Sequence, residues 1–409
     1  MRRPAYCHFE PGIEMPSQDE SHPTVPARIQ KRFPSIPHMK RPARWHIPRF
    51  AWDYLVGGIG LDENVRRNTE DLQKIQFMPR YLSAAPEPDI RTTLFGETLS
   101  APFGVAPVGL GGLMVPGCEI EIAKAARAGN IVHVLSTHAT TSLETIKPHA
   151  GPNGWFQLYP PNDPEMEADM IGRAKRAGYQ VLVVTVDIPG PTRRDHDIRN
   201  GLSVPPDFGV RTVTDAALRP TWLLRLARHG VPHFENIEPY APKDLSLAEF
   251  GEFLGRIFSG HITAERFKRI RDQWHGKIVV KGVLDPDEAA AYLALGADGI
   301  VVSNHGGRQL DAAPSAIAML PKVRERVGRE ALVMVDGGVR SGLDIARMIA
   351  LGADYILLGR PFIFASAAIG TAGPSHLIDV LKAELRGTMM QMGCGTLADL
   401  PGFLHAQNR

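Results

Sequence analysis

Short apolar runs alternate with helix-like stretches along most of the chain after residue 100. Runs that are apolar throughout are typical of strands buried on both faces, as in a parallel sheet. Eight strand–helix units predict an α/β fold, a single closed (β/α)8 TIM barrel. An open doubly wound sheet usually shows an early GxGxxG turn, which the chain lacks. The eight runs lie at 103–108, 130–137, 155–159, 181–187, 277–282, 299–305, 332–338 and 355–360.

Two segments do not follow this alternation of strands and helices. Residues 188–276 are too long for one strand-to-helix loop. We expect an insertion, about residues 188–261, that forms a lid or docking surface at the carboxyl-end face of the barrel. Short helices are predicted at 221–230 and at 262–274. Residues 1–45 are rich in proline and lack apolar periodicity, which favours an extended arm before one domain at 46–409.

Composition excludes several classes of protein. Of the 409 residues, 44% are hydrophobic and 22% are charged, which is ordinary for a globular protein with a sizeable core. A net charge of +2 gives no basis for nucleic-acid binding. The three cysteines lie far apart, so we expect neither a disulfide framework nor a metal site. Because the N-terminus lacks an apolar run and no spanning segment occurs, we expect a cytoplasmic protein.

Polar residues gather where the apolar runs end. In a TIM barrel these carboxyl ends form the active-site face. One such residue is explained equally well as a helix cap or a turn former. Five consecutive strands that all end in this way favour an active site. The residues are Thr185, Asp187, Lys281, Ser303, Asn304, His305, Asp336, Gly359 and Arg360.

Three of these stretches carry more specific chemistry. The glycine turns DGGVR (336–340) and LGRP (358–361) follow the last two strands, where barrels often bind a phosphate. Lys281 has three competing roles: Schiff-base nucleophile, partner of a structural carboxylate, or counter-ion to an anionic cofactor. In SNHGGRQLD (303–311), two glycines separate His305, which titrates near neutral pH, from Arg308, which can clamp a carboxylate.

With these motifs, residues 46–405 resemble the FMN-dependent α-hydroxy acid oxidases and dehydrogenases. The resemblance implies that His305 is the base and that Asp187 orients it and stabilises its imidazolium form. It also implies that Lys281 is the cation beside the flavin ring and that the protein is a homotetramer. The substrate carboxylate and hydroxyl are then held by Tyr54, Tyr159, Arg194 and Arg308.

The same resemblance implies the residues that bind FMN. They are Pro107, Val108, Gly109, Ser136, Gln157, Thr185, Lys281, Ser303, Asp336, Gly338, Arg340, Gly359 and Arg360. Two positions depart from the common pattern. Gly109 is more typical of dehydrogenase or monooxygenase members than of simple oxidases. His138 replaces a large aromatic residue, so we expect a more polar wall around the substrate. The arm at 1–45 is also longer than in the short members.

We therefore expect an FMN-dependent dehydrogenase that oxidises an L-2-hydroxy acid such as lactate, mandelate or glycolate to the 2-keto acid. Its electron acceptor would be a quinone or another carrier. One alternative is an oxidase that passes electrons to O₂ and forms peroxide, and another is action on a larger hydroxy acid or a peptide. From a different class, the chain could be a catalytically silent flavoprotein docked on a membrane through residues 221–258.

Overall fold

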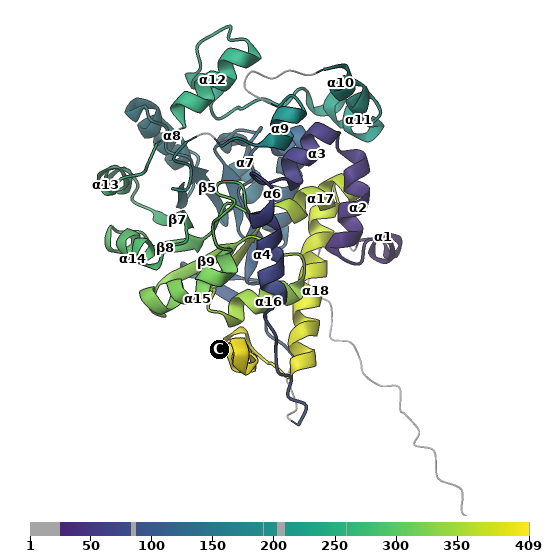
Figure 1. Cartoon of the computed structure of the whole chain (residues 1–409), viewed down its shortest axis with the longest axis vertical. Helices are drawn as coiled ribbons and strands as arrows, with labels where there is room; N and C mark the ends of the chain where they lie inside the picture. Colours follow the sequence, from purple (N-terminus) through teal and green to yellow (C-terminus); the bar gives the residue numbers. More distant parts are fainter. Residues whose placement is uncertain (1–24, 83–86, 191, 203–208, 259, 409) are drawn as a thin grey trace, which may run out of the picture.

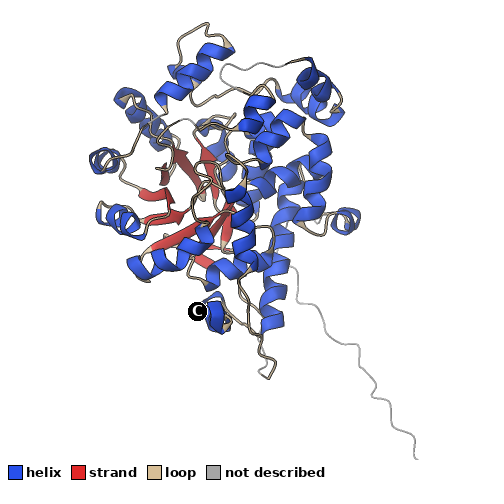
Figure 2. Ribbon diagram, viewed as in Figure 1, coloured by secondary structure: helices blue, strands red, loops and turns tan. Residues whose placement is uncertain are grey.

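The computed structural model describes residues 25–82, 87–190, 192–202, 209–258 and 260–408. Eight parallel strands close into a barrel, with the last strand paired to the first (Figures 1 and 2). This confirms the predicted TIM barrel, and each strand coincides with one of the apolar runs. The strands are β3 (Phe103–Val105), β4 (His133–Ser136), β5 (Gly154–Leu158), β6 (Val181–Thr185), β7 (Lys277–Val283), β8 (Gly299–Val302), β9 (Leu332–Asp336) and β10 (Tyr355–Leu358).

Helices surround the barrel and bury their apolar faces against the strands (Figure 2). Their starts follow local capping rules. Asp163 and Asp285 each accept two backbone N–H bonds, and a proline follows each of them at the first helical position. The helices are α6 (Cys118–Ala128), α7 (Leu143–Ala150), α8 (Pro164–Arg176), α13 (Ala264–Gln273), α14 (Pro286–Ala294), α15 (Ala316–Val327), α16 (Gly342–Ala350), α17 (Arg360–Ile369) and α18 (Gly373–Met392).

A hairpin that the sequence patterns did not reveal covers the amino-terminal end of the barrel. It consists of β1 (Thr92–Leu94) and β2 (Glu97–Leu99). Its turn residues Phe95 and Gly96 both have positive φ, as the tight turns of hairpins require. Leu94 and Leu99 pack against the side chains that fill the barrel interior. The hairpin therefore covers this end of the barrel, where its residues help to line a cavity of about 500 Å³.

Residues 27–46 are helical, so the extended conformation expected for the arm does not hold there. They form α1 (Ala27–Arg32) and α2 (Ile36–His46). Ile36, Met39 and Ala43 recur at helical spacing, and all three are buried, where α2 packs against α17. Pro37 occupies the first turn of α2, where proline is tolerated, whereas Pro42 lies inside the helix. Residues 1–24 lie outside the described residues, and the division of the chain at residue 46 stays a prediction.

Further short elements lie around the ends of the barrel. Those at the carboxyl end include α3 (Arg49–Val56), α4 (Glu63–Gln73) and α5 (Gly111–Met114), and the 3-10 turns η2 (Leu397–Phe403) and η3 (Ala406–Asn408) follow α18. Within the inserted segment are α9 (Asp195–Arg199), α10 (Val210–Ala217), α11 (Pro220–His229), η1 (Glu238–Tyr240) and α12 (Leu247–Ile257). The helices predicted at 221–230 and 262–274 are confirmed as α11 and α13. In the described part of the chain, no helix has the length and apolar character needed to cross a membrane.

Candidate active site

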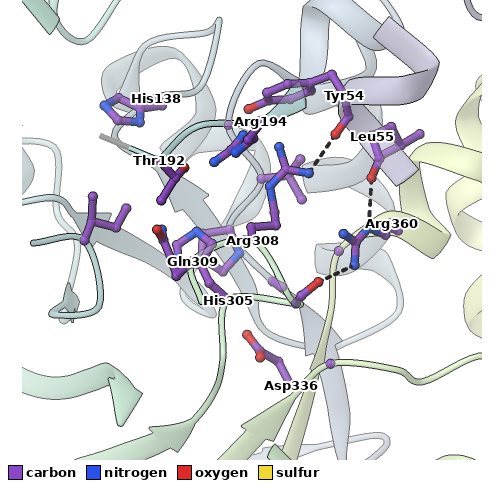
Figure 3. Close-up of a pocket in the computed structure, with 18 of the residues that line it drawn as sticks. Tyr54, Leu55, His138, Thr192, Arg194, His305, Arg308, Gln309, Asp336 and Arg360 are labelled. Carbon is purple, nitrogen blue, oxygen red and sulfur yellow. Dashed lines mark hydrogen bonds between the residues drawn. The ribbon is translucent and has the colours of Figure 1, made fainter. Parts of the chain in front are cut away.

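A cavity of about 830 Å³ opens at the carboxyl ends of the strands (Figure 3). It lies between the strand ends, the carboxyl end of α3 and the inserted segment. Most of the residues predicted for substrate and cofactor line it. They are Tyr54, Pro107, Val108, Gly109, His138, Tyr159, Arg194, Lys281, His305, Arg308, Asp336, Gly338, Arg340, Gly359 and Arg360. The other predicted residues, Ser136, Gln157, Thr185, Asp187 and Ser303, lie immediately behind this wall.

His305 lies between a carboxylate and a phenol. Its Nδ1 is 3.0 Å from Oδ1 of Asp187, and its Nε2 is 3.2 Å from the hydroxyl oxygen of Tyr159. Because an ionised carboxylate only accepts hydrogen bonds, Nδ1 carries the ring proton and Nε2 presents its lone pair. Burial by itself would raise the pKa of Asp187, but the charges of His305 and Lys281 outweigh it and lower that pKa. The arrangement fixes both the tautomer and the orientation of a base.

Tyr159 stays protonated in this arrangement. Burial, followed by the nearby charge of Asp187, raises the pKa of its phenol well above the ordinary value. Its hydroxyl therefore remains a hydrogen-bond donor to His305 Nε2 or to a bound substrate.

The backbone at the base is unusual. His305 has φ of 57°, in the left-handed region that non-glycine residues rarely adopt, and Gly306 and Gly307 continue with positive φ. A Cβ on Gly307 would lie 2.7 Å from the backbone nitrogen of Val65. The two glycines are thus required for the tight turn, which directs both His305 and Arg308 into the cavity as the motif predicted.

Two arginines face the same part of the cavity as Tyr54. The guanidinium carbons of Arg308 and Arg194 lie 4.6 and 5.8 Å from the centre of the Tyr54 ring. Nη2 of Arg308 and Nε of Arg194 are buried and have no hydrogen-bond partner. Burial, followed by the charge of Arg194, lowers the pKa of Arg308. Because unpaired buried donors are costly, this pair is well suited to bind an incoming carboxylate.

Several cavity residues were missed by sequence reasoning. Asp197 has Oδ2 3.7 Å from Nη1 of Arg194 and is the charged partner closest to that guanidinium. Burial raises the pKa of Asp197 despite the nearby arginines. Asp197 lies in the run TRRDHD, three residues after Arg194. Because no helix was predicted there, this spacing did not mark the two residues as neighbours. The inserted segment also contributes Ile188, Thr192, Ile198, Leu202 and Phe258, and the motif itself contributes Gln309.

Lys281 is paired with a carboxylate. Its Nζ lies 2.8 Å from Oδ2 of Asp336 and donates to Oγ of Ser303 at 3.0 Å. Burial alone would lower the pKa of Lys281, but Asp336 and Asp187 outweigh it and raise that pKa. A Schiff-base nucleophile needs the opposite shift, so the structure favours a permanent cation at the cavity wall.

Arg360 makes contacts that the sequence did not predict. Its Nε and Nη1 donate to the carbonyl oxygens of Leu55 and Gly306 at 2.8 and 3.0 Å (Figure 3). Its Nη2 donates to the carbonyl oxygen of Gly57 at 3.0 Å. Arg308 likewise donates to the carbonyl of Tyr54. Both arginines therefore hold the carboxyl end of α3, where cations are favoured, and fix the position of Tyr54. Sequence spacing could not show this second role.

Arg340 and Arg360 can also bind an anion at the side of the cavity formed by the ends of β9 and β10. Burial, together with the charges of Arg308 and Arg340, lowers the pKa of Arg360 to about 9, and burial lowers the pKa of Arg340. A cluster of confined cations with lowered pKa values is stabilised by a bound anion such as a phosphate. The glycine turns at Gly338 and Gly359 line the same region, as the motifs predicted.

Polar atoms at the carboxyl ends of β5, β6 and β9 are unsatisfied and suited to a flavin. Nε2 of Gln157, Oγ1 of Thr185 and Oδ1 of Asp336 are buried without partners. Ser136 donates to Oε1 of Gln157 and so orients the amide nitrogen. Buried polar groups normally find partners, and a ring with several donors and acceptors supplies them. By contrast, Asn304 is fully used in bonds to Asn64, Asn68 and a backbone carbonyl, so its role is structural.

A TIM barrel whose cavity combines a histidine oriented by a carboxylate, two arginines with unpartnered donors, and confined cations beside glycine turns is the arrangement expected of a flavin-dependent oxidoreductase. The model of the FMN-dependent dehydrogenase family matches residues 43–406. The chain therefore belongs to this family, and its cofactor is FMN.

Relatives and solved structures agree with this assignment. The chain is 40% identical over 364 residues to a protein named L-lactate dehydrogenase from Ectopseudomonas mendocina (strain ymp), covering 89% of this chain and 96% of that protein. It is also 40% identical over 359 residues to an L-lactate dehydrogenase from Serratia proteamaculans (strain 568), covering 88% and 94%. The crystal structure of the monotopic membrane protein (S)-mandelate dehydrogenase is similar with a TM-score of 0.86 and 32% identity, covering 91% and 98%.

Proposed function

We propose that the protein oxidises an L-2-hydroxy acid, of the kind of lactate, mandelate or glycolate, to the 2-keto acid. The observation that carries this proposal is the chain of contacts from Asp187 through His305 to Tyr159, opposite the unpartnered nitrogens of Arg194 and Arg308. A base and a carboxylate clamp that face one cavity match a substrate with a hydroxyl next to a carboxylate.

In the proposed reaction the substrate loses two electrons and two protons. Arg194 and Arg308 bind its carboxylate, and the hydroxyl of Tyr159 orients its hydroxyl. Nε2 of His305 receives a proton from the substrate, and Asp187 stabilises the imidazolium that results. Bound FMN would supply the two-electron acceptor, which would take up the electron pair together with the second proton. Lys281 places a positive charge at the part of the cavity wall where the cofactor would become negatively charged on reduction. Gln157, Thr185, Arg340 and the glycine turns would hold the cofactor.

We further propose that the protein is a dehydrogenase that passes its electrons to a quinone or another carrier. Gly109 lies in the cavity wall, as the resemblance implied for this type of member. An alanine there would bring its Cβ to 3.1 Å from Cβ of His138, which is a tight contact. We expect reduced enzyme to react slowly with air compared with an artificial acceptor. Rapid reoxidation in stopped-flow mixing with oxygen would favour the oxidase alternative.

The test of the activity is an anaerobic screen for bleaching of the flavin band. L-lactate, (S)-mandelate and glycolate are mixed with the purified protein, with D-lactate and (R)-mandelate as controls. Bleaching by an L acid, with the 2-keto acid recovered in equal amount, supports the proposal. If no 2-hydroxy acid bleaches the band while FMN is present at one per chain, the silent-flavoprotein alternative replaces it.

We also propose that the protein is cytoplasmic and docks on the membrane surface through α10 and α11, rather than through all of residues 221–258. Leu218 and Leu224 are 74% and 72% exposed, and Val210 is 81% exposed. Arg211 and Arg228 are exposed beside them, as suits contact with anionic lipid headgroups. The apolar face of α12 is excluded, because Phe253 is buried in the core. The monotopic mandelate dehydrogenase similar to this chain supports the proposal.

The membrane proposal is tested by flotation with vesicles that contain anionic lipid. The double variant Leu218→Glu/Leu224→Glu should remain yellow and active but lose binding to vesicles. Leu82→Glu, at an exposed apolar residue far from α10, is the matched control and should bind normally. Equal flotation of all three proteins would contradict this surface. The homotetramer implied by the family resemblance is tested separately, by light scattering in solution.

A further inference from the structure

None of the roles above uses the side-chain polar atoms of His138, which lines the cavity. It lines the cavity on the side of Thr192, away from the guanidinium of Arg360 (Figure 3). Its Nε2 is buried without a hydrogen-bond partner. Among the residues that the structure describes, only backbone and ring contacts are found for His138. A buried ring nitrogen without a partner is unfavourable, so the partner is expected to come from the contents of the cavity.

Aromatic rings hold the imidazole of His138 in a fixed orientation. It stacks on the ring of Tyr159 with the centres 4.5 Å apart, and the ring of Phe258 meets it edge-on at 4.8 Å. Phe234 makes a second edge-on contact at 6.1 Å. Because Phe234 and Phe258 both belong to the inserted segment, that segment encloses His138 against the barrel. A ring packed on several sides cannot rotate freely to find another partner.

The imidazole is also neutral. Burial, followed by the charges of His305 and Arg194, lowers the pKa of His138 to about 3. A neutral imidazole has one N–H donor and one lone pair, so it can hydrogen-bond to a hydroxyl but carries no charge for an anion. His138 is therefore suited to a neutral polar group rather than to a second carboxylate.

Distance from the base decides which part of a substrate can reach His138. Tyr159 uses its hydroxyl on His305 and its ring face on His138. The width of the Tyr159 side chain thus separates His138 from the reacting carbon. We therefore expect only side chains longer than the methyl group of lactate or the hydrogen of glycolate to reach it. The walls on this side are otherwise largely apolar, with Ile188, Leu202 and Phe258, which suits a longer or aromatic side chain.

We propose that His138 selects 2-hydroxy acids whose side chain is longer than a methyl group and carries a neutral hydrogen-bonding group at its far end, such as a phenolic hydroxyl. This inference rests on the proposed oxidation of 2-hydroxy acids and names the class of substrate. In it, Arg194 and Arg308 bind one end of the substrate and His138 binds the other. His138 is then a specificity-determining residue that takes no part in the transfer of protons or electrons.

The experiment compares matched pairs of substrates that differ only in the far hydroxyl. The pairs are (S)-mandelate with (S)-4-hydroxymandelate, and L-3-phenyllactate with L-3-(4-hydroxyphenyl)lactate. For the wild-type enzyme we expect kcat/KM to be about tenfold higher for the hydroxylated member of at least one pair, as one neutral hydrogen bond allows. The preference should be the same at pH 6 and pH 8, because His138 does not titrate there.

Two variants assign any preference to His138. His138→Phe keeps a ring to stack on Tyr159 but removes both nitrogens, and should abolish the preference while still oxidising the unsubstituted acid. His138→Gln keeps a donor and an acceptor and should restore part of the preference. The dissociation constants of phenylglyoxylate and 4-hydroxyphenylglyoxylate, followed by perturbation of the flavin spectrum, should change in parallel with kcat/KM.

The outcomes separate this inference from the proposed function. If no 2-hydroxy acid bleaches the flavin, the proposed function fails. If the unsubstituted acids are oxidised and the wild type shows no preference in either pair, the substrate class named here is wrong and water satisfies His138. A preference that persists in His138→Phe would assign it to another residue and would equally overturn the role of His138.

Discussion

Two clusters of charged residues at opposite ends of the barrel pair their polar groups differently. At the amino-terminal end, Asp298 binds both Arg271 and Lys277 at 2.8–3.1 Å and also accepts a backbone N–H bond. At the carboxyl end, Arg194, Arg308 and Asp336 each keep a buried atom without a partner. One end is covered by a hairpin, and the other opens into a cavity of about 830 Å³.

This difference shows where the molecule gains stability and where it keeps the capacity to bind. A polar group that is fully hydrogen-bonded stabilises the fold and has nothing left to offer a ligand. A buried polar group without a partner destabilises the ligand-free protein. A ligand that supplies the missing hydrogen bond removes this unfavourable energy. Removing groups at the carboxyl end should therefore change the reaction more than the stability, and groups at the amino-terminal end should do the reverse.

The largest effect is expected for His305→Gln. Its loss removes the base, so flavin reduction at saturating substrate should slow by at least ~10²-fold, the lower end of general-base contributions. FMN binding rests on other residues and should survive, so the variant should be yellow. Anaerobic stopped-flow reduction of both proteins measures this. Near-normal reduction would remove His305 from the reaction, and a colourless variant would place it among the residues that hold the fold.

A smaller effect is expected for Lys281→Met. Loss of the buried cation should lower the flavin reduction potential and weaken binding of sulfite by at least ~10-fold, because charge interactions are strong in a confined site. The substitution also leaves Asp336 as a buried charge without its partner, which destabilises the protein. The double variant Lys281→Met/Asp336→Asn corrects for this. An unchanged potential in both variants would place Lys281 outside the flavin site.

Asp298→Asn tests the amino-terminal end of the barrel. We expect the thermal midpoint to fall by about 1–3 °C, because Arg271 and Lys277 lose their partner, while kcat/KM stays within about twofold of wild type. Asp287→Asn is the matched control, since its pair with Arg326 is largely exposed and should contribute little. A loss of activity without a change in thermal midpoint would contradict the assignment of stability to the amino-terminal end and of the reaction to the carboxyl end.

The smallest effect concerns the pH dependence of stability at Asp187. Its pKa is lowered in the folded state, so ionised Asp187 stabilises the protein at pH values above the ordinary carboxyl pKa, and this contribution is lost as pH falls through the lowered value. The difference in thermal midpoint between wild type and Asp187→Asn should therefore be constant from pH 5 to 7 and shrink below about pH 4. A difference that grows on acidification would contradict the lowered pKa.

The sequence by itself determined the barrel and most of the residues around its cavity. Strand periodicity and the position of a residue at a strand end are local properties, and in a closed parallel barrel all strand ends meet at one face. For this reason Lys281, His305 and Asp336 were predicted to lie together. Helix α2 was missed because prolines hid an apolar repeat that only packing against α17 makes visible.

Only the tertiary structure decided which polar groups pair with one another and which stay free. Lys281 could have been a nucleophile until its contact with Asp336 made it a permanent cation. Arg360 could not be seen to hold the end of α3, about 300 residues away in sequence. The unpartnered nitrogen of His138 depends on rings from the distant inserted segment. Such pairings join residues far apart along the chain, so their energies are fixed by packing and not by local sequence.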